Sequence, residues 1–226
     1  MIEISNLTKC YHKKAVVKEL SFHIKENETF ALLGSNGAGK STTIKMMLGL
    51  VRPDGGSVRI MEGKTVGYSP ETPYFPEFLT GMEVLAYYAK LQKISKKERD
   101  EILPQILSGV GLENDRTKVR GYSKGMLQRL ALGQALIGNP DILILDEPCA
   151  GLDAMGRIEM IRLIRKLKDS GKTILMNSHI LSDIEKVCDR GIIMKKGNCL
   201  KEWTKEDLAD GSTLETLFTE TIGGMV

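Results

Sequence analysis

The sequence has no long apolar run of the kind that crosses a membrane. None of its 226 residues belongs to a stretch of roughly 18 consecutive apolar residues, the minimum for a spanning helix. Its first ten residues, MIEISNLTKC, contain an acid, Glu3, and lack the apolar centre of a secretory signal. We therefore expect a cytosolic protein that does not cross a membrane by itself.

The sequence also has no large excess of positive or negative charge and no closely spaced pair of cysteines. The formal net charge is +3, and the densest basic stretch, KLQKISKKER at 90–99, is most simply a solvated helix face. Cys10, Cys149, Cys188 and Cys199 include no C-x-x-C pair and have no histidine at metal-ligand spacing. Reduced thiols without assigned chemistry are expected, and charge alone does not suggest nucleic acid as a partner.

Apolar runs of strand length alternate with helical patterns along the chain. TFALLGS precedes the helical KSTTIKMMLGLV, and the near-continuous apolar runs PDILILDEP and KTILMNSH flank the helical RIEMIRLIRKLKDSG. Runs buried on both faces are typical of parallel strands in βαβ units. The sequence therefore predicts an α/β domain.

Two segments depart from this alternation. MIEISNL and ELSFHIK, within the first 30 residues, predict antiparallel strands, and residues 83–112 read as polar-faced helix. We expect a single domain in which 1–71 and 122–226 form a β-subdomain and the core, and 72–121 form an inserted helical subdomain.

The strongest motif is GSNGAGKST, residues 34–42, which matches G-x-x-x-x-G-K-[ST] between a predicted strand and a predicted helix. Its glycines allow the backbone to wrap a polyphosphate, Lys40 reaches the β- and γ-phosphates, and Ser41 can ligate Mg²⁺. ATP and Mg²⁺ are the expected cofactors. The expected nucleotide-binding residues of this loop are Asn36, Gly37, Ala38, Gly39, Lys40, Ser41 and Thr42.

A second motif is ILILDEP, an apolar strand that ends in two acids. Asp146 at the carboxyl edge of a sheet can hold Mg²⁺ through water, and Glu147 can orient or deprotonate the attacking water. A simple strand-ending turn is the alternative, which the presence of the P-loop disfavours. Together the two motifs predict a P-loop NTPase core.

A third segment, YSKGM at 122–126, follows a turn and opens an apolar-periodic helix, so Ser123 reads as a helix cap beside an anion-binding N-terminus. This segment resembles the signature of the ATP-binding cassette (ABC) ATPases, typically Leu-Ser-Gly-Gly-Gln. Ser123 and Gly125 match, whereas Lys124 and Met126 depart, in a form similar to the drug- and peptide-exporter branch. The resemblance implies a RecA-like core with a mixed, mainly parallel sheet, a trimmed antiparallel β-subdomain and a helical insertion.

The resemblance extends to other positions of the nucleotide site. It implies that Asp153 in CAGLDA is the acid of the D-loop and that His179 is the switch histidine at the γ-phosphate, although a lone His before a helix is more often structural. It also implies that Tyr11 stacks on adenine and Val16 packs on the nucleotide. Tyr11 has a plainer interpretation, because Tyr is common in strands.

Glu71, in VGYSPETPYFP, occupies the place where most ABC ATPases have a Gln that touches Mg²⁺ and senses the transmembrane partner. A carboxylate can bind the metal and position water, but it adds negative charge near the phosphates. The implied catalytic residues are Glu147, His179, Lys40 and Glu71. The implied metal ligands are Ser41, Glu71 and Asp146.

In this family the signature serves the P-loop of a facing chain, so the resemblance implies composite sites in a head-to-tail homodimer or heterodimer. It further implies the ATP-hydrolysing subunit of an exporter, peripheral on the inner face of the cell membrane through a separate permease. Tyr74, Phe75, Phe78 and Tyr87 could contact that permease, although we expect at least half of them to pack within the helical lobe.

Two other functions stay open at this point. One is a soluble ABC ATPase that acts on DNA, ribosomes or iron–sulfur assembly, and the other, less favoured, is a P-loop kinase. The segment TLETLFTETIGG at 213–224 resembles the tail of exporter-type cassettes. The transported substrate is not encoded here, because in exporters it contacts the membrane subunit.

Overall fold

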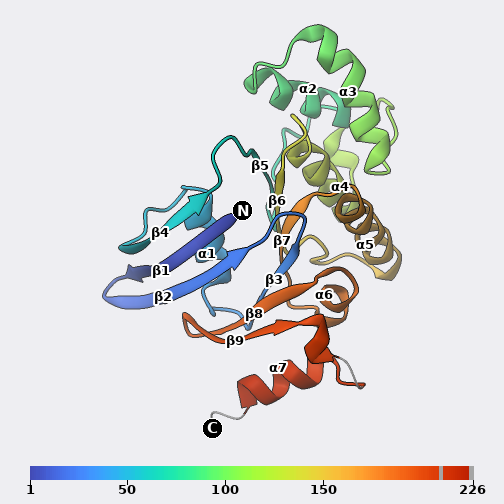
Figure 1. Ribbon diagram of the computed structural model, residues 1–226. Coiled ribbons are helices and arrows are strands. Elements are labelled where there is room, and N and C mark those ends of the chain that lie inside the picture. The colour runs from blue at the N-terminus through green and yellow to red at the C-terminus, as the bar shows by residue number, and fades with distance from the viewer. Residues whose placement is uncertain (209–210, 224–226) are drawn as a thin grey trace. The chain divides into compact units, whose positions relative to one another are not determined.

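Buried β-strands form the core of the computed structural model, which describes residues 1–208 and 211–223 (Figure 1). The chain divides into two units, one comprising Met1–Lys64 with the chain from Lys168 onward, the other Thr65–Leu167. The helical insertion expected at 72–121 lies entirely within the second unit. The last residue of the exporter-like tail, Gly224, lies outside the described residues.

The described strands and helices alternate from α4 to β8, whereas three strands open the chain and three helices follow β5. The strands are β1 Ile2–Tyr11, β2 Lys14–Ile24, β3 Thr29–Gly34, β4 Gly55–Ile60, β5 Val66–Ser69, β6 Ile142–Asp146, β7 Thr173–Asn177, β8 Arg190–Lys195 and β9 Asn198–Thr204. The helices are α1 Lys40–Met47, α2 Gly81–Leu91, α3 Lys96–Gly109, α4 Lys124–Ala135, α5 Ala154–Asp169, α6 Leu181–Val187 and α7 Leu214–Gly223, with 3₁₀ turns at Val119–Gly121 and Lys205–Leu208.

The first unit contains strands of two kinds. β2, β1 and β4 form an antiparallel sheet in that order, with Ile4 opposite both Phe22 and Val58. β3 pairs in parallel with β7 on one side and β8 on the other, and β9 returns antiparallel to β8. Every residue of β3 and β7 is buried, as their near-continuous apolar runs predict. The predicted antiparallel and parallel strands are thus confirmed.

The second unit pairs β5 and β6 in parallel and carries α2 to α4 and most of α5. The helical segment expected at 83–112 is interrupted once. Lys93 adopts a left-handed φ of 60°, and the Ser95 side chain then caps α3 by accepting from the Glu98 N–H. Within the described residues, no helix is both long and apolar enough to cross a bilayer.

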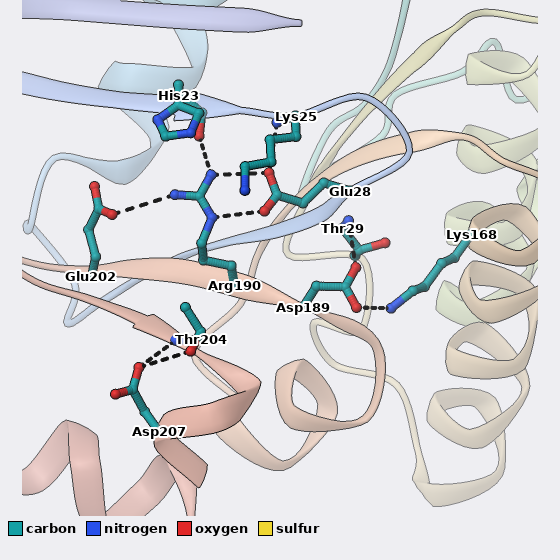
Figure 2. A network of polar contacts seen from close by, with 10 residues as sticks. All are labelled: His23, Lys25, Glu28, Thr29, Lys168, Asp189, Arg190, Glu202, Thr204 and Asp207. Atoms are coloured by element: carbon teal, nitrogen blue, oxygen red, sulfur yellow. Dashed lines mark hydrogen bonds and ion pairs between the residues drawn. The ribbon is translucent and has the colours of Figure 1, made fainter. Parts of the chain in front are cut away.

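A polar network joins the amino ends of β3 and β8 in the first unit (Figure 2). Arg190 donates to both carboxylate oxygens of Glu28, at 2.8 and 3.2 Å, and to the His23 carbonyl at 2.7 Å. Burial alone would raise the pKa of Glu28, but hydrogen bonds from Arg190 and the Lys25 N–H outweigh it and lower this pKa. Ligands of parallel sheets bind at the carboxyl ends, so this network is structural.

Replacing Arg190 with Met should lower the free energy of unfolding by about 3 kcal/mol, because the buried Glu28 carboxylate loses its partner. The loss should be greatest above the ordinary pKa of a carboxyl and fade as pH falls below about 4, since the lowered pKa makes the pair stabilising only while Glu28 is ionised. Urea unfolding at several pH values measures this.

The control is Arg59→Met, which removes an exposed pair with Glu3 at 3.6 Å and should change stability little. Equal losses from both substitutions would contradict the structural role of the Arg190 pair.

Candidate nucleotide-binding site

The P-loop joins β3 to α1 in the first unit, and close backbone packing sets its shape. Gly34 has φ +155°, and a Cβ there would lie 2.5 Å from the Met194 carbonyl oxygen. Gly39 has φ +108°, and a Cβ there would lie 2.7 Å from the Val16 carbonyl oxygen. Larger residues would therefore push the loop away from its neighbours, which explains why this turn needs glycine at both ends.

Lys40 opens α1 and is nearly buried, with 7% of its surface exposed. Its Nζ donates to the Gly34 carbonyl at 2.7 Å, so the ammonium lies over the loop. Gly39 is the N-cap of α1 and has no side chain that could accept from the first-turn N–H groups. The half-buried Ser41 and Thr42 follow in that turn. A helix end of this kind binds a polyphosphate.

The other predicted nucleotide contacts of the first unit lie around this loop or at strand ends. Val16, on β2, contacts the loop through its carbonyl beside Gly39. Tyr11, at the end of β1, is 41% exposed, and Lys9 Nζ lies over its ring, 5.5 Å from the ring centroid. His179 is exposed and lies two residues after the end of the fully buried β7. Asn36, Gly37 and Ala38 form the turn, in which the Ala38 N–H donates to the Ser35 carbonyl at 3.0 Å.

The acidic residues lie in the second unit, at the end of β6. Asp146 and Glu147 are buried, and Glu147 has a left-handed φ of 49°, which costs a non-glycine residue of the order of 1 kcal/mol. The Ala150 N–H donates to the Glu147 carbonyl at 2.9 Å and closes the turn. Such strain at a buried acid is typical of functional positions.

Tyr68, on β5, is a site residue that the sequence reasoning missed. It pairs with Ile144 in the β5–β6 register, so its side chain shares a face with Asp146 two residues later. Burial, the charge of Asp146 and a hydrogen bond to that carboxylate raise the pKa of Tyr68 to about 12. The phenol is thus protonated at neutral pH and donates to Asp146. The only sequence signal was an aromatic residue three positions before Glu71.

Glu71 is exposed just beyond β5, and its charge also raises the pKa of Tyr68. The second unit therefore brings Glu71, Tyr68 and Asp146 close together. No group of three His, Cys, Asp or Glu side chains that could hold a metal is found among residues 1–208 and 211–223. The predicted Mg²⁺ ligands are the carboxylates of Glu71 and Asp146 and the hydroxyl of Ser41, which do not make up such a group of three. Mg²⁺ ligation by these residues therefore stays a prediction.

The signature segment places its serine at the start of α4. Ser123 is exposed, and its Oγ accepts from the Met126 N–H at 3.2 Å, the expected cap. Gly125 follows in the first turn. Asp153 caps α5 by accepting from the Gly156 N–H at 2.7 Å, so this carboxylate has a structural role whatever else it contacts.

A P-loop between a buried parallel strand and a helix, with an acid-terminated strand elsewhere in the chain, defines the class of P-loop nucleotide-binding domains. Residues 17–150 match the family described as ABC transporter. The chain belongs to the ABC transporter family, and within it to the subunits that bind and hydrolyse ATP.

Two relatives illustrate the match. The linearmycin resistance ATP-binding protein LnrL of Bacillus subtilis is 34% identical over 236 residues, covering 100% of this chain and 76% of LnrL. An ABC transporter ATP-binding protein of Synechocystis sp. is 45% identical over 196 residues, covering 81% of this chain. The matched region spans only 55% of the Synechocystis protein's length.

Two solved structures share the fold. The structure of an ATP-binding subunit of an ABC transporter has a TM-score of 0.86 at 32% identity, covering 98% of this chain and 99% of that one. The dimeric, post-hydrolysis structure of the cassette MJ0796 with ADP and Pi has a TM-score of 0.81 at 25% identity, covering 90% of this chain and 98% of that one. The predicted α/β cassette fold is thus confirmed.

Proposed function

We propose that this chain is the ATP-hydrolysing subunit of an exporter and binds Mg-ATP between two cassettes packed head to tail. The observation that carries the proposal is the presence in one chain of two helix N-termini of a kind suited to binding phosphate. α1 follows the P-loop with Gly39 at its cap, and α4 follows the signature with Ser123 at its cap. A cassette that served only its own nucleotide would need one of them.

The proposed chemistry assigns roles to the predicted residues. Lys40 and the P-loop N–H groups hold the β- and γ-phosphates, and Ser41 with Asp146 and Glu71 would hold Mg²⁺, whose charge offsets that of the phosphates. Glu147 orients the attacking water and His179 contacts the γ-phosphate. Tyr68 keeps the Asp146 carboxylate in place. Tyr11 and Val16 contact the nucleotide itself.

The P-loop that faces the signature of this chain would come from a second cassette, which would be an identical or a different chain. The dimeric MJ0796 structure, which shares this fold, supports such a pairing. In the proposed dimer Ser123, Gly125 and Asp153 meet the nucleotide held by the facing chain. The resistance function in the name of LnrL favours transport over a soluble role in DNA, ribosome or iron–sulfur processes.

The permease would dock on the helical part of the second unit. Three of the four aromatics singled out in the sequence are exposed, Tyr74 at 86%, Phe78 at 74% and Tyr87 at 50%. Phe75 alone is buried, against Tyr88 with a ring separation of 6.2 Å. The half-exposed Tyr87 also packs edge-on against Tyr88, at a ring separation of 5.4 Å, so two of the four aromatics make ring contacts within the helical lobe, as expected. Exposed aromatics this close in sequence are typical of a protein contact, and such docking would keep the chain at the inner membrane face.

Replacing Phe78 with Glu should abolish co-purification with a polytopic membrane protein when a tagged chain is expressed from its native locus and extracted in mild detergent, because a charge cannot be buried in an apolar contact. Leu50→Glu, which alters an apolar residue of the first unit that is 67% exposed, should retain the partner. Failure of the unaltered chain to retain any membrane protein would contradict the proposed function.

A further inference from the structure

Gln128 is a buried polar residue on α4, five positions after Ser123. Only 1% of its surface is exposed. Its Nε2 donates to the Glu71 carbonyl at 2.7 Å, while its Oε1 is buried without a hydrogen-bond partner among the described residues. A buried, half-satisfied amide costs free energy relative to an apolar side chain of the same size. Packing alone therefore does not explain why a Gln occupies this position. What Gln128 provides, and an apolar side chain would not, is the single hydrogen bond to the Glu71 carbonyl.

This hydrogen bond links two predicted functional segments of the second unit. Glu71 lies just beyond β5, and Gln128 belongs to the helix that begins at the signature. The other end of α4 is held against β5 by close packing, since a Cβ at Gly67 would lie 2.1 Å from the Ala135 carbonyl oxygen. Near its N-terminus, α4 is tied to the loop that carries Glu71 through Gln128.

We propose that Gln128 is a positioning residue that holds the Glu71 loop to the signature helix, so that Ser123 and Glu71 take up their catalytic positions together. The inference rests on the proposed roles of Ser123 at a facing nucleotide and of Glu71 near the metal. Gln128 touches neither nucleotide nor metal in this account. Its hydrogen bond to the Glu71 carbonyl oxygen, 57 residues away in sequence, fixes the position of the Glu71 loop relative to α4.

Gln128→Met tests this, because Met has nearly the same volume and lacks the donor. The kcat for ATP hydrolysis should fall about tenfold while KM for ATP changes less than about threefold, since the P-loop contacts are untouched. The Mg²⁺ concentration for half-maximal activity should shift in the same direction as in Glu71→Gln. Rates are referred to the concentration of nucleotide-binding sites, so that a poorly folded fraction does not count.

Two further variants make the result specific. Gln134→Met alters a half-buried Gln on the same helix and should leave kcat and the Mg²⁺ titration unchanged. Gln128→Leu loses the donor with a differently shaped side chain and should reproduce the defect of Gln128→Met. A Gln128→Met protein with the kcat and Mg²⁺ titration of the unaltered chain would overturn the proposal.

The double variant Gln128→Met/Glu71→Gln separates the inference from the proposed function. If Gln128 acts through Glu71, adding Glu71→Gln to Gln128→Met should change kcat less than about twofold. Effects that multiply independently would overturn the role of Gln128 and leave that of Glu71 standing. A single Glu71→Gln variant with unchanged Mg²⁺ dependence would instead overturn the proposed metal role of Glu71, and with it the coupling.

Discussion

Replacing Glu147 with Gln should preserve ATP binding and reduce ATP turnover by a factor on the order of 100 or more. Glu147 follows the last residue of a fully buried strand and is itself 7% exposed, with its backbone in a left-handed conformation. Gln has nearly the same shape, so the turn and the P-loop are preserved. The amide cannot accept a proton from water, and the hydrolytic step should therefore stop.

Retained binding and lost turnover are measured separately. A fluorescent nucleotide titration should give an affinity within a few-fold of the unaltered chain, and phosphate release should fall to background. Because ATP persists, Glu147→Gln should also elute as a dimer on gel filtration with Mg-ATP. Glu113→Gln, at an exposed loop position, is the matched control, and full turnover in Glu147→Gln would remove Glu147 from the catalytic role.

The parallel strands and the P-loop could be predicted because their signals are local. β3, β6 and β7 are near-continuous apolar runs without the alternation of an amphipathic strand, and the P-loop directly follows β3. The helix break before α3 was missed because it depends on one left-handed residue, Lys93, in an otherwise helical pattern. Which of the four aromatics are exposed, Tyr74 at 86% among them, could not be predicted because burial is decided by tertiary packing.

The site residues found only in the structure depend on contacts distant in sequence. Tyr68 reaches Asp146 across the β5–β6 register, and Gln128 reaches the Glu71 carbonyl from a helix that begins more than fifty residues later. No motif contains either pair. A lone Tyr in a short strand and a Gln in a helix are also common in proteins that bind no nucleotide, so neither residue stood out.

Lys40→Ala and Ser123→Arg should each abolish hydrolysis in a homodimer, for different reasons. Lys40→Ala removes the ammonium that lies over the P-loop of its own chain. Ser123→Arg leaves that loop intact but places a bulky cation at the N-terminus of α4, where the γ-phosphate of a facing chain must approach. Phosphate release from each purified variant should be at background.

Mixing these two inactive proteins tests the composite site most directly. In a mixed dimer both substitutions face each other across one interface, and the other interface has an unaltered P-loop opposite an unaltered signature. ATPase activity should return to about a quarter of the unaltered rate if chains pair at random and sites act independently. Crosslinking must show that mixed dimers have formed. Mixed dimers that bind ATP at one site yet neither hydrolyse it nor close around it would contradict the account, because Ser123 would then act only as the cap of its own helix.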